Sequence, residues 1–229
     1  STRSRYQEEL DGNGQNRTLS HDLDGDGTFE LVEEIEIVVE ASGESTTENN
    51  RINADQTLRS STTTHLSADA RVKTVEADLD GDGVVDRVTE TENSYNATGN
   101  LNQTVTVQNA DGSIRSIEKE YITSNKYSRK SWVDLDQDGV LEEHEKVSET
   151  TRNHNTGVLT QNNWDRNADG SVNARSWTVT SADGLTSTTR HDANFDGNEE
   201  TKTVDQTVIA GNGSSTRTVA VTNKDGSGR

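Results

Sequence analysis

The sequence predicts an all-β chain built from tandem repeats of about four antiparallel strands each. Three observations carry this prediction. A short acidic segment returns at spacings of 56, 56 and 58 residues, which sets a repeat of about 57 residues. Stretches rich in Thr and Val alternate with period two, which is typical of half-buried strands. Hydrophobic residues make up only 27% of the chain, so a large apolar core is excluded.

The recurring segment has the pattern Asp-x-[Asp/Asn]-x-Asp-Gly. Its copies begin at Asp22, Asp78, Asp134 and Asp192, and they check one another because chance does not place four such segments in near register. The recurrence divides the chain into five parts: residues 1–21 as the end of a preceding repeat, 22–77, 78–133, 134–191, and 192–229 as a partial repeat.

Between the acidic segments, turn signals separate short strand-like stretches. Asn109 to Gly112, Asn167 to Gly170 and Ser181 to Gly184 each combine a residue whose side chain caps a turn with a Gly that accepts positive φ. Residues 104–107 and 218–221 lie between such turns and alternate β-branched with small or polar residues. No stretch shows the apolar stripe of a helix, so each repeat is expected to be a set of hairpins.

The amino-acid composition limits the classes of binding partner that the chain can have. The formal net charge is −19 and aromatic residues make up 4%. Such an acidic chain repels phosphates, which excludes nucleic acid as a partner, and it attracts cations. There is no Cys and no Pro, so disulfides contribute nothing and sheet edges must be protected by charge. No stretch approaches the roughly 18–20 apolar residues that a transmembrane helix needs.

The acidic segments have the ligand pattern of calcium loops. Calcium prefers six to eight oxygen ligands, side chains at loop positions 1, 3 and 5 can converge on it, and Gly at position 6 allows the sharp turn. Position 9 is acidic in all four copies. The expected ligands are Asp22, Asp24, Asp26 and Glu30; Asp78, Asp80, Asp82 and Asp86; Asp134, Asp136, Asp138 and Glu142; and Asp192, Asn194, Asp196 and Glu200.

About four Ca²⁺ ions are therefore expected. Magnesium keeps its waters and transition metals favour His or Cys, so both fit these loops less well. Position 12 carries Glu33 in the first loop and Glu145 in the third, and the spacing leaves open whether these two also bind the metal. The neutral amide of Asn194 is expected to weaken the fourth site. The flanking residues lead into strands, which excludes an EF-hand.

The loop pattern resembles two known groups. One is the calcium loop of FG-GAP and VCBS (integrin-type) repeats, and the other is the calcium-binding tandem-repeat exoproteins and adhesins of Gram-negative bacteria, which resemble RTX proteins. The first resemblance implies a four-bladed β-propeller. The strands here are too polar to bury both faces, so an extended array or a wound β-ribbon is favoured and the propeller is the alternative.

The second resemblance implies a secreted structural segment of a bacterial surface, filament or biofilm-matrix protein. The alternative is an adhesin or carbohydrate-binding module that contacts cell-surface glycans, with Trp132, Trp164 and Trp177 available to stack on a sugar. Copies of the chain or neighbouring repeats are expected partners. No nucleophile elbow, P-loop or His-Glu-x-x-His motif occurs, so no enzymatic activity is expected.

Overall fold

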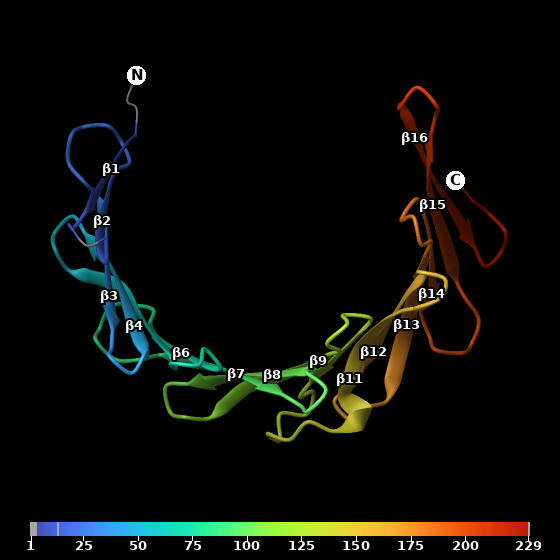
Figure 1. Cartoon of the computed structure of the whole chain (residues 1–229), viewed down its shortest axis with the longest axis horizontal. Coiled ribbons are helices and arrows are strands. Elements are labelled where there is room, and N and C mark those ends of the chain that lie inside the picture. The colour runs from blue at the N-terminus through green and yellow to red at the C-terminus, as the bar shows by residue number, and fades with distance from the viewer. Residues whose placement is uncertain (1–3, 13, 229) are drawn as a thin grey trace. The chain divides into compact units, whose positions relative to one another are not determined.

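The computed structural model describes residues 4–12 and 14–228, which form strands joined by turns (Figure 1). Residues 1–3, 13 and 229, from the first and last predicted segments, lie outside this description. The prediction of an all-β fold is confirmed. The strands are β1 (Arg5–Leu10), β2 (Asn16–Asp22), β3 (Leu31–Val39), β4 (Ser45–Asn53), β5 (Leu58–Leu66), β6 (Val72–Asp78), β7 (Arg87–Tyr95), β8 (Leu101–Asn109), β9 (Ile114–Ile122), β10 (Ser128–Val133), β11 (Lys146–Arg152), β12 (Leu159–Arg166), β13 (Val172–Thr180), β14 (Thr186–Asp192), β15 (Thr201–Ile209) and β16 (Ser215–Asn223).

The strands belong to one antiparallel sheet whose spatial order follows the chain order from β1 to β16. Each strand pairs with the strand before it and the strand after it, as in a meander of hairpins. A propeller would divide the strands into separate four-stranded sheets, and the strand order shows no such division. In the described residues the helical structure is one 3₁₀ turn, η1 (Glu143–Glu145), before β11.

The chain forms two compact units. The first unit comprises Ser1–Asn93 and Thr104–Ser116, and the second comprises Ser94–Gln103 and Ile117–Arg229. Within the first unit, β3 and β4 pair in continuous register from Leu31↔Asn53 to Val39↔Ser45. Within the second, β15 and β16 pair from Thr201↔Asn223 to Ile209↔Ser215.

The predicted turn residues do close hairpins. The N–H of Gly112 donates to the carbonyl of Asn109 at 2.9 Å, and the N–H of Gly170 donates to Asn167 at the same distance. Side chains reinforce these turns, because the carboxylate of Asp111 accepts the N–H of Ser113 at 2.9 Å. The glycines take positive φ, 80° at Gly112. The Asn/Asp-Gly pairs therefore fix these turns. Equivalent turns have positive φ at Gln56, Ala70 and Lys126, which are not glycines.

The sheet has a very small apolar core. Among the described residues, the buried hydrophobic side chains are only Leu19, Ala77 and Ile117. The buried charged side chains are more numerous: Asp22, Asp78, Asp134, Glu145 and Asp192. Burying a charge is costly unless it is hydrogen-bonded or binds a cation, so the surroundings of these five carboxylates decide how stable the acidic loops are.

No helix of the described residues is both long and apolar enough to cross a membrane.

Candidate metal sites

The four acidic loops connect β2 to β3, β6 to β7, β10 to β11 and β14 to β15. Since strands of a meander alternate in direction, connections that follow even-numbered strands lie at one edge of the sheet. In each unit, two acidic loops share this edge with a hairpin turn between them: residues 53–57 in the first unit and 167–171 in the second. All four acidic loops therefore follow strands that run in the same direction.

The first Asp of each loop is buried and held by the backbone of its own loop. Asp22 is 1% exposed. Its Oδ1 accepts the N–H of Gly25 at 2.6 Å and its Oδ2 accepts the N–H of Gly27 at 3.1 Å. The same pattern recurs around Asp78 and Asp134. Asp192 also accepts two backbone N–H groups, but from Asp196, one residue later than in the other loops, and from Gly197. Two N–H donors fix the orientation of each carboxylate, which leaves its remaining lone pairs available to a cation.

The ninth position closes three of the four loops. Oε2 of Glu30 accepts the N–H of Leu23 at 2.5 Å, and Asp86 does the same for Leu79 at 2.7 Å. In the fourth loop, Glu200 accepts the N–H of Ala193 at 2.6 Å. These contacts bring the ninth side chain back over the start of the loop, beside the buried Asp.

Carboxylates converge in all four loops. In each group one oxygen per residue lies within 4.8 Å of an oxygen of every other member. The groups are Asp22, Asp24, Asp26 and Glu30; Asp78, Asp80 and Asp86; Asp134, Asp136 and Glu145; and Asp192, Asp196 and Glu200. Of the expected acidic ligands, Asp82, Asp138 and Glu142 are outside these groups.

The third loop differs from the others at its closing residue. Glu145, at position 12, takes the place that position 9 occupies elsewhere, because its Oε1 accepts the N–H of Leu135 at 2.6 Å. The 3₁₀ turn η1 accommodates the three additional residues at positions 10 to 12. Oε2 of Glu145 also accepts the N–H of Glu142 at 3.1 Å. Glu145 is completely buried. In the first loop, position 12 behaves differently, since Glu33 forms an ion pair with Arg51 at 2.8 Å.

The pKa values of Glu142 and Glu145 in the third loop shift in opposite directions. Burial raises the pKa of Glu142, and the neighbouring carboxylates of Glu145 and Asp138 raise it further. Burial acts on the pKa of Glu145 in the same direction, but the N–H groups of Leu135 and Glu142 outweigh it and lower that pKa. Glu145 is therefore the residue of the pair that holds its negative charge more firmly.

The donor set fits a hard cation such as Ca²⁺. All candidate ligands are carboxylate or amide oxygens, and no His or Cys belongs to the groups. In the third loop, Oε2 of Glu142 is buried with no hydrogen-bond partner among the described residues. Glu142 stands outside the carboxylate group of this loop, so this oxygen is not among the ligands that the geometry brings together. Ca²⁺ would be held in the third loop by Asp134, Asp136 and Glu145 and would offset two of their three negative charges.

Position 4 of every loop adopts a left-handed conformation. Gly25 and Gly81 have φ of 78° and 80°, and Gln137 and Phe195 have φ of 60° and 53° at the equivalent place. This conformation costs an L-residue with a side chain about 1–2 kcal/mol. The third and fourth loops therefore carry backbone strain that the first two avoid.

A side chain at Gly81 would collide with the backbone of a neighbouring strand, whereas one at Gly83 would not. A Cβ at Gly81 would lie 2.3 Å from the carbonyl oxygen of Leu58, whereas a Cβ at Gly83 would meet nothing within 4 Å. Both residues have positive φ, 80° and 85°. Gly81→Ala is expected to lower the free energy of unfolding by at least about 1 kcal/mol more than Gly83→Ala, because the backbone of β5 must move. Urea denaturation of the two variants measures the difference, and equal losses would contradict the close approach.

No protein-family model matches the chain, and no curated protein matches its sequence.

Proposed function

We propose that the chain is a calcium-stabilised structural segment of an extracellular bacterial surface, filament or matrix protein. The observation that carries the proposal is the composition of the buried set. Each acidic loop buries the carboxylate of its first Asp and the third also buries Glu145, while the apolar core amounts to three side chains in the described residues. A sheet of this kind depends on what binds its carboxylates more than on hydrophobic burial.

Calcium would act mainly on the charge of the chain. Without metal, each loop holds three or four carboxylates at close range, and the formal net charge is −19. Four Ca²⁺ ions carry eight positive charges and would reduce the magnitude of the net charge to 11. Since the loops converge only in the folded chain, the free energy of binding contributes to the free energy of folding.

The compartment follows from the expected affinity. Extracellular calcium modules bind with Kd of about 10⁻⁴–10⁻³ M. Sites of this affinity stay empty at cytosolic calcium concentrations and fill outside the cell. The chain would then remain unfolded until it is exported and would become rigid where calcium is abundant, which suits a structural segment.

Limited proteolysis tests this proposal. The chain is digested in millimolar Ca²⁺, in excess EDTA, and in millimolar Mg²⁺ as the matched cation control. Protection is expected in calcium alone, with cleavage in EDTA spread over the acidic loops and the strands beside them, because all four loops lose their counter-charge together. Strong resistance in EDTA, or equal protection by magnesium, would contradict the proposal.

A further inference from the structure

One face of the second unit is cationic although the chain is acidic. Residues that pair directly across antiparallel strands lie on the same face. The pairs Trp132↔Lys119, Trp164↔Arg175 and Trp177↔Arg190 therefore define one face across β9 to β14, and Arg190↔Lys202 extends it to β15. We call this the cationic face; its basic residues are Lys119, Lys130, Lys146, Arg166, Arg175, Arg190 and Lys202.

Few carboxylates offset these charges. Glu149 is one acidic residue in the strands of this face. Its carboxylate lies 3.5 Å from Nζ of Lys130 and 3.3 Å from Nζ of Lys146. The strands of this face also include Asp192, which belongs to the fourth acidic loop. Two carboxylates from the loops also pair with this face, because Glu199 lies 3.0 Å from Arg190 and Glu143 lies 3.7 Å from Lys146. Seven basic residues thus meet four carboxylates, and the face keeps an excess of positive charge.

The three tryptophans of this face hold the basic groups in place. Nζ of Lys119 lies 5.6 Å from the ring centroid of Trp132, and Nζ of Lys146 lies 5.5 Å from that of Trp164. The guanidinium of Arg175 lies 5.1 Å from the ring of Trp177. These are cation–π distances. Because basic groups already lie against the rings, charge dominates what the face offers to a partner, ahead of open aromatic surface.

The first unit carries the opposite charge on one of its faces. The pairs Thr18↔Glu34, Glu36↔Glu48 and Thr63↔Glu76 place a series of glutamates on one side of β2 to β6. We call this the acidic face; its carboxylates, continued by the registers of β1 and β7, are Glu9, Glu34, Glu36, Glu48, Glu76, Glu90 and Glu92. The paired basic residue of this face in the described strands is Arg5, opposite Asp22.

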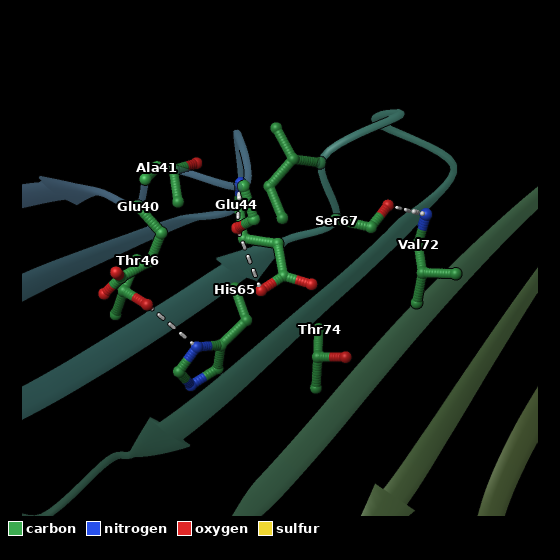
Figure 2. Close-up of a pocket in the computed structure, with 11 residues that line it drawn as sticks. Glu40, Ala41, Glu44, Thr46, His65, Ser67, Val72 and Thr74 are labelled. Carbon is green, nitrogen blue, oxygen red and sulfur yellow. Dashed lines mark hydrogen bonds between the residues drawn. The ribbon is translucent and has the colours of Figure 1, made fainter.

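A hollow at one end of the acidic face adds to it. Figure 2 shows the side chains of Thr46, His65 and Thr74 in this hollow, which has a volume of about 590 Å³. Glu40 and Glu44, from the turn between β3 and β4, also line it. The hollow therefore offers two further carboxylates and room for a long basic side chain.

Both faces contain like charges in directly opposed positions. Glu36 faces Glu48 across β3 and β4, and Arg190 faces Lys202 across β14 and β15. Such pairs destabilise an isolated sheet. In the described part of the chain, neither Glu36 nor Glu48 belongs to an ion pair. Arg190 already pairs with Glu199 at 3.0 Å, so the repulsion that a partner of opposite charge would relieve is the one between Glu36 and Glu48.

We propose that the acidic face of one copy of the chain docks on the cationic face of a second copy. The acidic face carries seven glutamates and the cationic face keeps an excess of basic groups, so the charges of the two faces are complementary. Stacked sheets lie about 10 Å apart, close enough for Glu carboxylates to reach Lys and Arg groups. After docking, one copy keeps its cationic face free and the other keeps its acidic face free, so the contact is heterologous and can continue into a filament.

Sedimentation velocity of the calcium-loaded 229-residue chain tests this, at several concentrations and in about 0.01 M and 1 M salt, where the Debye length is about 30 and 3 Å. Concentration-dependent association is expected in low salt and its loss in high salt. The double variants Glu36→Lys with Glu48→Lys, and Lys119→Glu with Lys202→Glu, should each weaken self-association by at least about tenfold. A mixture of the two variants should form a 1:1 complex, because each supplies one native face.

The matched control is Glu118→Lys with Asp165→Lys, which changes the net charge as much as the first variant does but on the opposite face of the second unit. It should associate as the unaltered chain does, and circular dichroism confirms that every variant keeps its β-signal. A monomer at all concentrations in low salt would overturn the proposal. So would equal weakening by the control, or binding to an anionic polysaccharide without self-association.

Discussion

Replacing Asp22 by alanine is expected to abolish one calcium site and lower the free energy of unfolding by about 2–4 kcal/mol. Two N–H groups, of Gly25 and Gly27, lose their acceptor, and an unsatisfied buried donor costs about 1–3 kcal/mol. The bound ion is lost as well, together with its share of folding free energy. Isothermal titration with Ca²⁺ counts the sites, and urea denaturation in calcium measures the stability.

Asp55→Ala is the matched control for this variant. Asp55 also accepts a backbone N–H, from Thr57 at 3.0 Å, and it lies at the same edge of the first unit, but it is exposed and belongs to no carboxylate group. The number of bound ions should be unchanged by its loss. If Asp22→Ala binds as many ions as Asp55→Ala, the first loop is a solvated turn and the proposed site is wrong.

Glu145→Ala should have the second large effect, a loss of about 3 kcal/mol in the free energy of unfolding and of one calcium ion. Glu145 is completely buried and accepts the N–H groups of Leu135 and Glu142, so its removal leaves two donors without an acceptor. It also opens a cavity beneath the third loop. Titration with Ca²⁺ and urea denaturation again report the two losses.

Glu142→Ala tests whether position 12 or position 9 supplies the closing ligand of the third loop. If position 9 closes the third loop as in the other three, Glu142→Ala should remove the ion and Glu145→Ala should spare it. The structure leads to the reverse order of effects, because the carboxylate of Glu145 lies with Asp134 and Asp136. A larger loss of calcium affinity in Glu142→Ala than in Glu145→Ala would contradict the geometry of this loop.

The strands and hairpins could be predicted because their signals are local. Alternating β-branched residues such as those of 104–107 and 218–221 lie within β8 and β16, and Asn109 to Gly112 forms the turn that follows β8. Each signal needs only a few neighbouring residues to act. The acidic loops were visible for the same reason, since all their candidate ligands lie within 12 consecutive residues.

The closing residue of the third loop could not be predicted from spacing. Glu142 and Glu145 are both acidic, so a ligand pattern accepts either. The choice depends on η1, a single helical turn that places Glu145 against the N–H of Leu135. The left-handed φ of Phe195 is equally hidden, because a bulky residue gives no local signal for that conformation.

The two charged faces depend on strand register, which a single strand does not determine. Glu36 and Glu48 are in separate strands, and only the pairing of β3 with β4 places them side by side. The sequence shows Trp132, Trp164 and Trp177 as aromatic residues, but their basic neighbours come from adjacent strands. A shift of one residue would move either set to the other side of the sheet.

We propose that calcium, more than apolar burial, holds this sheet together. Far-ultraviolet circular dichroism and thermal melting of the chain, in excess EDTA and then in millimolar Ca²⁺, test it most directly. We expect the β-signal and a cooperative melt to appear only when calcium is present, and to disappear again when EDTA is added. An equally strong β-signal with the same melting temperature in EDTA would show that the acidic loops are ordinary turns and that the fold is stable without metal.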